Sequence, residues 1–226
     1  MQATLAELLA EFIGSMFLVM AVVASIIMFT VVLESHPGVT IIGVTIAVTF
    51  VLAALLEMFR QVSGAHFNPV VTVVMMIHRS ISAGKAAFYV IVQIAGGILG
   101  TVLSHLMFYE EMGALFFISG EVRSGHIYYG EVIGSFILVL AILVLVKIKS
   151  DKISIIIGLL VGGQLLSTSS TMFANPQVTI ARIFTSSASG IRPFDAMIFI
   201  VMQFIGGLLA YLVYRLMFSK AEVKEE

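Results

Sequence analysis

The chain has 226 residues, of which 60% are hydrophobic and 11% are charged, and its mean hydropathy is strongly positive. This composition excludes an ordinary soluble domain and predicts an all-α membrane protein that contacts lipid along most of its length. The net charge of −1 argues against a nucleic-acid partner, and the lack of cysteine excludes disulfides and cysteine metal sites. The first apolar segment has no basic leader, so we expect a retained membrane helix rather than a signal peptide.

Six apolar stretches are long enough to form transmembrane helices. They lie at roughly 7–32, 40–60, 86–108, 129–148, 153–170 and 195–217. Two further apolar stretches, at about 68–78 and 175–185, are too short to span a membrane. Each begins at an Asn-Pro pair, and Asn suits a helix cap as Pro suits the first turn. We therefore expect two half-helices that begin inside the membrane.

The two halves of the chain repeat each other. The sequence EFIGS at 11–15 returns as EVIGS at 131–135, and QIAGG at 93–97 returns as QFIGG at 203–207. Each half, 1–110 and 128–219, is predicted to hold three spans and one half-helix, with 111–127 as an outer connecting loop and 220–226 as a cytoplasmic tail. Because three is odd, the second half is inverted, and the two half-helix tips meet near the midplane. Non-helical backbone at that depth lines a cavity or is buried in protein, so a pore is expected.

The distribution of lysine and arginine predicts the orientation. With both termini in the cytoplasm, nine of the 12 basic residues lie inside and three lie outside. The inner ones are Arg60, Arg79, Lys85, Lys147, Lys149, Lys152, Arg215, Lys220 and Lys224, and the outer ones are Arg123, Arg182 and Arg192. The connections at 34–38 and 110–123 then face outward. We expect a multi-pass integral membrane protein with both termini in the cytoplasm.

Two Asn-Pro half-helices in an inverted six-span repeat resemble the aquaporin, or major intrinsic protein, family over nearly the whole chain. The stretch SGAHFNP at 63–69 is similar to that family's first loop motif, and Glu11 and Glu131 match its paired glutamates. The resemblance implies an hourglass pore in each subunit of a homotetramer, without a cofactor or a metal. It implies a pore centre at Asn68, Pro69, Val70, Asn175, Pro176 and Gln177.

The family usually has alanine as the third motif residue, where this chain has Val70 and Gln177. The larger, polar Gln177 is expected to narrow or rewire the centre. Asn68 and Asn175 are expected to donate hydrogen bonds from their amide N–H groups to the solute. An amide donor cannot pass a proton on, and the positive ends of the half-helices repel cations. The alternative is that both asparagines only cap their half-helices.

For Glu11 and Glu131 we favour buried carboxylates that support loop N–H groups over a proton relay or a solute ligand. An acidic group inside a membrane is unfavourable without a partner, and loop N–H groups supply one.

The family's selectivity filter takes one residue from the second helix, one from the fifth and two from the second Asn-Pro loop. Counting from the Asn-Pro pairs without gaps places this filter at Val48, Gly163, Met172 and Val178. The water-channel pattern has an aromatic residue, His and Arg at three of these positions. The glycerol-facilitator pattern has Arg followed by Asp, where this chain has Val178 and Thr179. We therefore expect a wide, mainly apolar filter without arginine.

Arg182 follows Val178 by one helical turn, so its charge is a candidate for the outer vestibule. The alternative is that it pairs with a carboxylate such as Asp195 or hydrogen-bonds loop carbonyls. The segment at 173–193 resembles a bacterial branch that lacks the filter arginine and is often associated with arsenic-resistance operons. That resemblance implies arsenite-like hydroxides or oxyanions as candidate solutes.

Three functions are compatible with this sequence. A passive channel for water and small uncharged solutes is favoured. A proton-coupled secondary transporter needs an acidic site at the midplane, for which Glu11, Glu131 and Glu57 are the candidates. A structural membrane protein with a closed pore is the third. An enzyme is not expected, since the histidines are scattered without metal-ligand spacing or a nucleophile–base pair.

Overall fold

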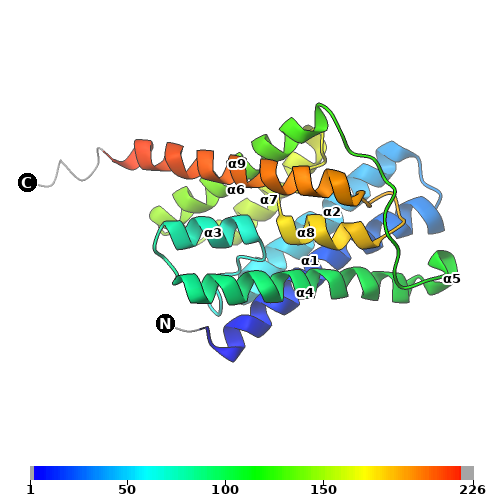
Figure 1. The fold of residues 1–226 in the computed structure, drawn as a ribbon, viewed down its shortest axis with the longest axis horizontal. Helices are drawn as coiled ribbons and strands as arrows, with labels where there is room; N and C mark the ends of the chain where they lie inside the picture. The colour runs from blue at the N-terminus through cyan, green and yellow to red at the C-terminus, as the bar shows by residue number, and fades with distance from the viewer. Residues whose placement is uncertain (1–2, 220–226) are drawn as a thin grey trace, which may run out of the picture.

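The structure is a computed structural model that describes residues 3–219, so the expected tail at 220–226 lies outside the described residues. Figure 1 shows a bundle of long helices with two short ones inside it. The helices are α1 (Leu5–Ile27), which continues as a π-helical turn at Met28–Val32, α2 (Pro37–Phe59), α3 (Pro69–Ile77), α4 (Ala83–Met107), α5 (Tyr109–Met112), α6 (Ile127–Lys147), α7 (Ile153–Ser167), α8 (Pro176–Ala181), which continues as a 3-10 turn at Arg182–Phe184, and α9 (Pro193–Phe218).

Five of these helices are long and apolar enough to cross a membrane: α1 with its π-helical turn, α2, α4, α6 and α9. The sixth expected span, predicted at 153–170, is α7, which has 15 residues and ends at Ser167. At 1.5 Å per residue, α7 is roughly 22 Å long, which is shorter than a hydrocarbon core of ~30 Å. The chain leaves the helix at Thr168, whose extended backbone begins the loop toward Asn175. The expected all-α membrane fold with two half-helices is confirmed.

Local sequence explains where the helices begin. All four prolines of the chain, Pro37, Pro69, Pro176 and Pro193, occupy the first turn of a helix, where a missing N–H costs no hydrogen bond. Thr4 forms a capping box with Glu7 at the start of α1. These local preferences determine where the helices begin, independently of how their apolar faces pack.

The helices pack as two similar halves. In the first half α1 packs along α4, and in the second half α6 packs along α9. Glycines permit the close approach, because a Cβ at Gly96 would lie 2.3 Å from the Phe12 carbonyl oxygen and a Cβ at Gly206 would lie 2.3 Å from that of Val132. The two half-helices, α3 and α8, lie end to end between α4 and α9, each contacting both (Figure 1).

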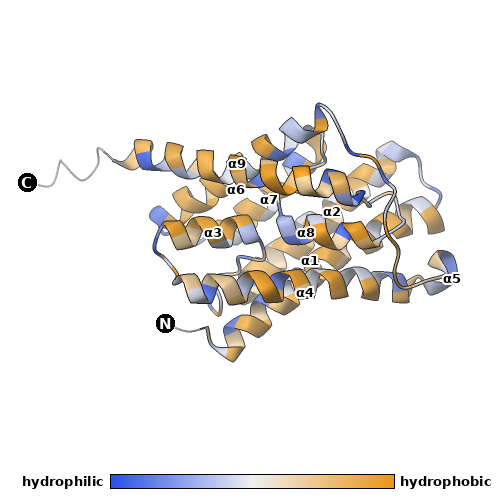
Figure 2. Ribbon diagram, viewed as in Figure 1, coloured by the Kyte–Doolittle hydropathy of each residue, from blue (hydrophilic) through white to orange (hydrophobic). Residues whose placement is uncertain are grey.

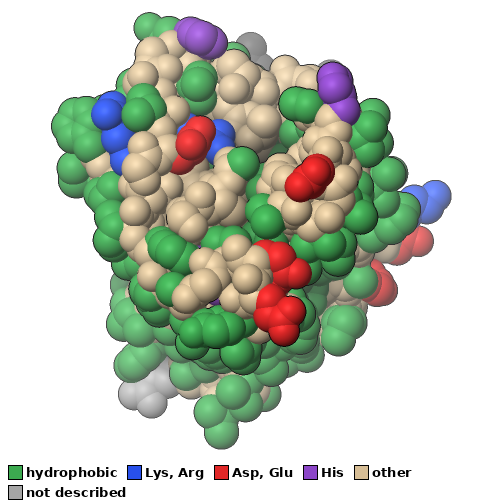
Figure 3. All heavy atoms as spheres, turned by 90° about the vertical axis from the view of Figure 1, so that its right-hand side faces the viewer, with side chains coloured by type: hydrophobic (Ala, Val, Ile, Leu, Met, Phe, Trp, Pro, Cys, Tyr) green, Lys and Arg blue, Asp and Glu red, His purple; other side chains and the backbone are tan. Residues whose placement is uncertain are grey.

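The two ends of the bundle differ. Figure 1 shows both ends of the described chain at one end, here called the inner end, with α5 at the opposite, outer end. Apolar residues cover the lengths of the helices, and polar residues gather in the connections (Figure 2). Figure 3 views the outer end, where acidic side chains are spread over the surface beside a smaller group of Lys and Arg side chains. The arrangement fits a bundle that crosses a membrane an even number of times.

Candidate pore and selectivity filter

Asn68 and Asn175 cap the two half-helices from opposite sides. The Asn68 Oδ1 accepts a hydrogen bond from the Val70 N–H at 2.9 Å, and the Asn175 Oδ1 accepts one from the Gln177 N–H at 3.1 Å. Each asparagine thus satisfies a backbone donor that its short helix leaves open.

The same two asparagines also connect the halves. Asn68 Nδ2 donates to the Ala174 carbonyl at 2.8 Å, and Asn175 Nδ2 donates to the Phe67 carbonyl at 2.8 Å. An amide nitrogen carries two N–H groups, so each asparagine retains one donor beyond its cross-connection. Both residues line the large cavity described next.

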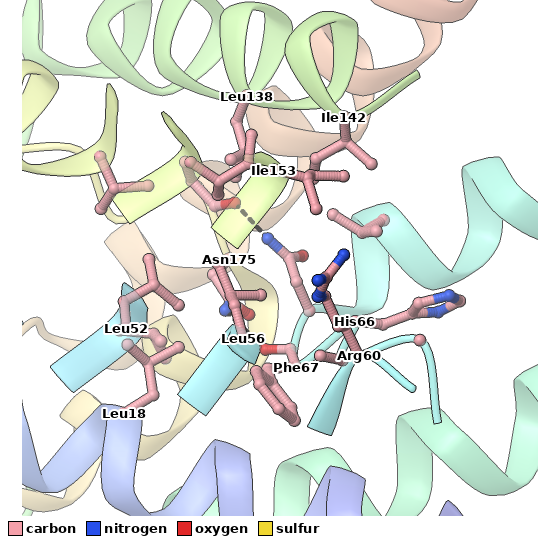
Figure 4. A pocket seen from close by; sticks show the side chains of 18 of the residues that line it. Leu18, Leu52, Leu56, Arg60, His66, Phe67, Leu138, Ile142, Ile153 and Asn175 are labelled. Carbon is pink, nitrogen blue, oxygen red and sulfur yellow. Dashed lines mark hydrogen bonds between the residues drawn. The ribbon is translucent and has the colours of Figure 1, made fainter. Parts of the chain in front are cut away.

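A cavity of about 410 Å³ passes both asparagines. Figure 4 shows Leu18, Leu52, Leu56 and Leu138 among the apolar side chains around Asn175. Most of its wall is aliphatic, from α1, α2, α3, α6 and α7: Leu18, Val22, Val48, Leu52, Leu56, Val71, Met75, Leu138, Ile142, Leu145, Val146, Ile153, Ile157, Val161 and Leu165. Aliphatic side chains form no hydrogen bonds with water or solute. The hydrogen-bonding groups of the cavity are therefore the asparagines and the polar residues toward its two ends.

Three of the four residues expected in the filter line this cavity: Val48, Met172 and Val178. The fourth, Gly163, is exposed and lies outside it, and a Cβ added there meets nothing within 4 Å. The residues of α7 that line the cavity are Ile153, Ile157, Val161 and Leu165, each about one turn from the next. The gapless count therefore placed α7 wrongly by two residues, which on a helix of 3.6 residues per turn is the opposite face.

The remaining motif residues do not line the cavity. Val70 is fully buried, and a Cβ at Gly207 of α9 would lie 2.3 Å from its Cγ1. Gln177 is also fully buried, and a Cβ at Gly97 of α4 would lie 2.1 Å from its Oε1. The third motif residue thus packs each half-helix onto a glycine of a long helix. Gln177 does not line the cavity, so of the two expected effects, narrowing or rewiring of the centre, its contacts fit the second.

Gln177 does alter the hydrogen bonds behind the pore wall. Its Nε2 donates at 3.3 Å to the Phe67 carbonyl, the acceptor that Asn175 also uses. The prolines Pro69 and Pro176 are buried first-turn residues of α3 and α8 and do not line the cavity either.

Glu11 and Glu131 lie fully buried beside the two loops that precede the asparagines. Glu11 accepts backbone hydrogen bonds from His66 at 2.9 Å and Phe67 at 2.8 Å. Glu131 accepts them from Phe173 at 3.0 Å and Ala174 at 2.9 Å. Each carboxylate therefore holds two consecutive N–H groups of a loop that has no helical partners for them.

A glutamine completes each carboxylate cluster. Gln93 Nε2 donates to Glu11 at 2.8 Å and to Thr72 at 2.9 Å, which ties α4 to both α1 and α3. Gln203 Nε2 makes the equivalent bonds to Glu131 and Thr179 in the second half. The repeat of QIAGG as QFIGG contains both glutamines, but sequence reasoning assigned them no partner. The available signal was that a glutamate and a glutamine each recur at equivalent positions of the two halves.

The loops before the asparagines adopt the same unusual backbone. Ala65 and Phe67 have φ of 49° and 46°, and the equivalent Met172 and Ala174 have φ of 43° and 45°. Left-handed conformations cost non-glycine residues about 1–2 kcal/mol each. The hydrogen bonds to Glu11 and Glu131 offset this cost, and the carbonyls of Phe67 and Ala174 accept the amide hydrogen bonds of Asn175 and Asn68.

Arg182 lies in the cavity wall near the outer end. Its side chain is 3% exposed, its guanidinium carbon lies 3.4 Å from the centroid of the Phe173 ring, and its Nε donates to the Ser189 carbonyl. The expected partner Asp195 is engaged elsewhere, by Arg192 at 2.7 Å. Arg182 thus both lines the cavity and hydrogen-bonds a loop carbonyl, while its pairing with Asp195 is wrong.

A second guanidinium lies on the same aromatic ring. The Arg123 guanidinium carbon is 5.0 Å from the centroid of Phe173, and the side chain donates to the carbonyls of Gly190 and Ala188. Burial lowers the pKa of Arg123, while the charge of Glu121 acts in the opposite direction. Phe173 went unnoticed in the sequence, because nothing local shows that two arginines distant in sequence converge on it.

Basic and polar residues also border the inner end of the cavity. Arg60, His66 and Lys149 all contribute to its wall, and Figure 4 shows the Arg60 side chain beside Phe67 and His66. Arg60 is paired with the exposed Glu57 at 3.2 Å. Sequence reasoning used Arg60 and Lys149 for orientation only and assigned them no place in the pore.

Comparisons with known proteins agree with this geometry. A sequence profile described as "Major intrinsic protein" matches residues 1–174. The chain is 36% identical over 213 residues to the aquaglyceroporin AqpS of Rhizobium meliloti (strain 1021), covering 94% of this chain and 90% of that protein. It is 31% identical over 221 residues to the probable aquaporin TIP3-2 of Arabidopsis thaliana, covering 92% and 82%.

The fold is also similar to a solved structure, the X-ray structure of the aquaglyceroporin from Plasmodium falciparum. The TM-score is 0.63 at 17% sequence identity, over 96% of each chain. At that identity the likeness concerns the fold alone. Since the profile covers most of the chain and AqpS is related over nearly all of it, the chain belongs to the major intrinsic protein family.

Proposed function

We propose that this protein is a passive transmembrane channel for water and small uncharged solutes, with a wide selectivity filter that lacks the usual arginine. The observation that carries this proposal is that Val48, Met172 and Val178 line the same cavity as Asn175. Aliphatic and thioether side chains bind no solute strongly, and they leave more room than an aromatic ring and an arginine. Members of the family are channels and not enzymes.

The related proteins support a channel for small neutral molecules. AqpS is named an aquaglyceroporin and TIP3-2 a probable aquaporin, so both classes of solute occur among the relatives. In this chain, the remaining donors of Asn68 and Asn175 supply hydrogen bonds to a hydroxyl-bearing solute at the centre. Val161 or Leu165 takes the filter position on α7 that Gly163 was expected to hold.

Arg182 is proposed to restore a positive charge to the outer part of the pore. It lines the cavity, as Val178 does, and no ion pair to it occurs among the described residues. A fixed cation with little hydration repels permeating cations more strongly than one at an open surface. The same charge favours one part of a second candidate function, the passage of small oxyanions, whereas uncharged arsenite-like hydroxides would depend on the width of the filter instead.

The proton-coupled transporter has less support. Glu11 and Glu131 do not line the cavity. Their carboxylate oxygens accept hydrogen bonds from loop N–H groups and from glutamine side chains. We assign them a role in holding the loops. The proposed protein is a homotetramer in a bacterial inner membrane. Each subunit has two halves, at 1–110 and 128–219, and both of its termini lie in the cytoplasm.

Reconstitution tests the proposal directly. Proteoliposomes and empty liposomes are mixed with impermeant sucrose, glycerol, urea or arsenite, and the light scattering is followed by stopped flow. We expect water and glycerol permeability well above that of lipid. The solute flux should rise linearly with the solute concentration and should not depend on a proton gradient. Flux that saturates and follows the proton gradient would favour a transporter, and permeability equal to that of lipid would favour a closed structural protein.

A further inference from the structure

We propose that a basic pocket at the inner end of α3, α6 and α9 binds the phosphate headgroup of an anionic phospholipid. The pocket has a volume of about 260 Å³ and is lined by His78, Lys147, Tyr214, Arg215, Phe218 and Ser219. It shares no lining residue with the pore cavity. The proposal is therefore independent of which solute the channel conducts.

Three basic side chains reach the pocket from three different helices. His78 caps the C-terminus of α3, Lys147 lies in the last turn of α6, and Arg215 lies in the last turn of α9. A cation at a helix C-terminus stabilises the helix dipole, which explains Lys147 and Arg215 singly. That effect does not require all three to converge on one pocket. Among the described residues that line it, none is acidic.

Aromatic rings hold the site in place. The His78 ring lies edge-on to Tyr211 at 6.0 Å and to Tyr214 at 5.5 Å between ring centroids. Tyr214 in turn packs on Phe218 at 5.0 Å. Tyrosines are enriched at the level of lipid headgroups, where one end of the side chain is apolar and the other is wet. The ring of His78 is thereby fixed between two tyrosines at the wall of the pocket, of which Tyr214 is buried.

The flanks of the pocket are apolar and exposed. Val146 of α6 is 44% exposed, and Leu212 and Leu216 of α9 are 55% and 66% exposed. Figure 2 shows α9 as largely apolar almost to its end, with a polar turn there. A phosphate in the pocket would leave acyl chains free to lie against Leu212 and Leu216. This adjacency favours a lipid over a soluble phosphate ester, which has nothing to place there.

The position agrees with the membrane side. The pocket lies at the end of the bundle that holds both ends of the described chain (Figure 1). With the orientation proposed above, this end meets the cytoplasmic leaflet. Basic pockets between membrane helices on that side bind anionic headgroups such as those of cardiolipin.

The experiment measures lipid binding to the full chain in detergent by native mass spectrometry. Phosphatidylglycerol is titrated against phosphatidylcholine of the same acyl chains, and glycerol 3-phosphate is the soluble competitor. We expect phosphatidylglycerol to bind more tightly than phosphatidylcholine, and Lys147→Gln to weaken it by about fivefold, the effect of one cation near a charged headgroup. Glycerol 3-phosphate at equal concentration should displace little of it.

The matched control is Lys152→Gln, which removes the same charge at the same end from an exposed residue outside the pocket. Equal binding of the two lipids, or equal loss in Lys147→Gln and Lys152→Gln, would overturn the proposal. Displacement by glycerol 3-phosphate would assign the pocket to a soluble phosphate ester instead. Arg215→Gln provides a second variant, and unchanged water permeability of each variant shows that it has folded.

Discussion

Arg182 lies face-on to Phe173, with its guanidinium carbon 3.4 Å from the ring centroid. The N–H of Phe173 is in turn bound by the buried Glu131 at 3.0 Å. A cation on the cavity wall is therefore attached to the same scaffold that positions Asn175. A charge held this rigidly acts on permeating solute without first paying the entropy of ordering a flexible side chain.

Replacing Arg182 by methionine removes this charge and keeps a long apolar side chain. We expect cation leak to rise by about tenfold, corresponding to a barrier lowered by roughly 1.4 kcal/mol, with water flux little changed. Conductance of planar bilayers containing the variant measures this. Arg192→Met is the control, since Arg192 is paired with Asp195 and does not line the cavity. An identical leak in both variants would mean that Arg182 has a folding role only.

Asn175→Asp replaces a donor by a carboxylate that faces the Phe67 carbonyl oxygen, now accepting a hydrogen bond at 2.8 Å. Loss of the donor and repulsion between the oxygens should reduce water flux by about tenfold, since an unmade buried hydrogen bond costs roughly 1–3 kcal/mol. Stopped-flow light scattering measures the flux. Asn68→Asp should act similarly, because Asn68 bonds Ala174 in the equivalent way. Unchanged flux in both variants would remove the asparagines from the pore centre.

Val178→Arg adds a large cation to a wall position that is now aliphatic and 5% exposed. Glycerol permeability should fall much further than water permeability, because the narrowed filter still admits a water molecule but obstructs the larger glycerol. Parallel glycerol and water measurements on proteoliposomes check this. Gly163→Ala is the matched control outside the cavity and should change neither. Equal loss of water and glycerol in Val178→Arg would argue against a filter at this residue.

Gly97→Ala should destabilise the protein, since the new Cβ would lie 2.1 Å from the Gln177 Oε1 inside a fully buried contact. The expected cost is about 1–3 kcal/mol for overpacking. Thermal unfolding in detergent measures the loss. The double variant Gly97→Ala with Gln177→Ala should recover most of it, because the clashing atom is removed. Failure of the second substitution to rescue the first would show that the contact does not determine the packing.

Mercurial reagents should not inhibit this channel, because the chain contains no cysteine. Val178→Cys would introduce a thiol in the cavity wall, and the variant should become sensitive to block. Water flux before and after mercurial treatment, with reversal by a thiol reductant, measures the effect. Block of the unmodified protein would contradict a thiol-based mechanism of inhibition.

Much of the architecture follows from local sequence. Apolar runs long enough to span a membrane leave few alternatives to helices, because lipid offers no partner for backbone N–H and carbonyl groups. The Asn-Pro pairs begin α3 and α8 where expected, since capping and first-turn preferences act over a few residues. Repetition of the glutamate and glutamine segments in both halves similarly made a two-fold arrangement predictable from the sequence.

The sequence by itself thus determined the membrane helices, the half-helices and the paired halves, because these depend on composition and short-range preferences. Only the tertiary structure decided which side chains reach the pore. A shift of two residues on α7 moves Gly163 away and brings Val161 and Leu165 in, since two residues rotate a helix by about 200°. In the folded chain Val70 and Gln177 pack onto Gly207 and Gly97, and Arg123 joins Arg182 on the ring of Phe173. Such contacts join residues far apart in sequence, and no local preference specifies them.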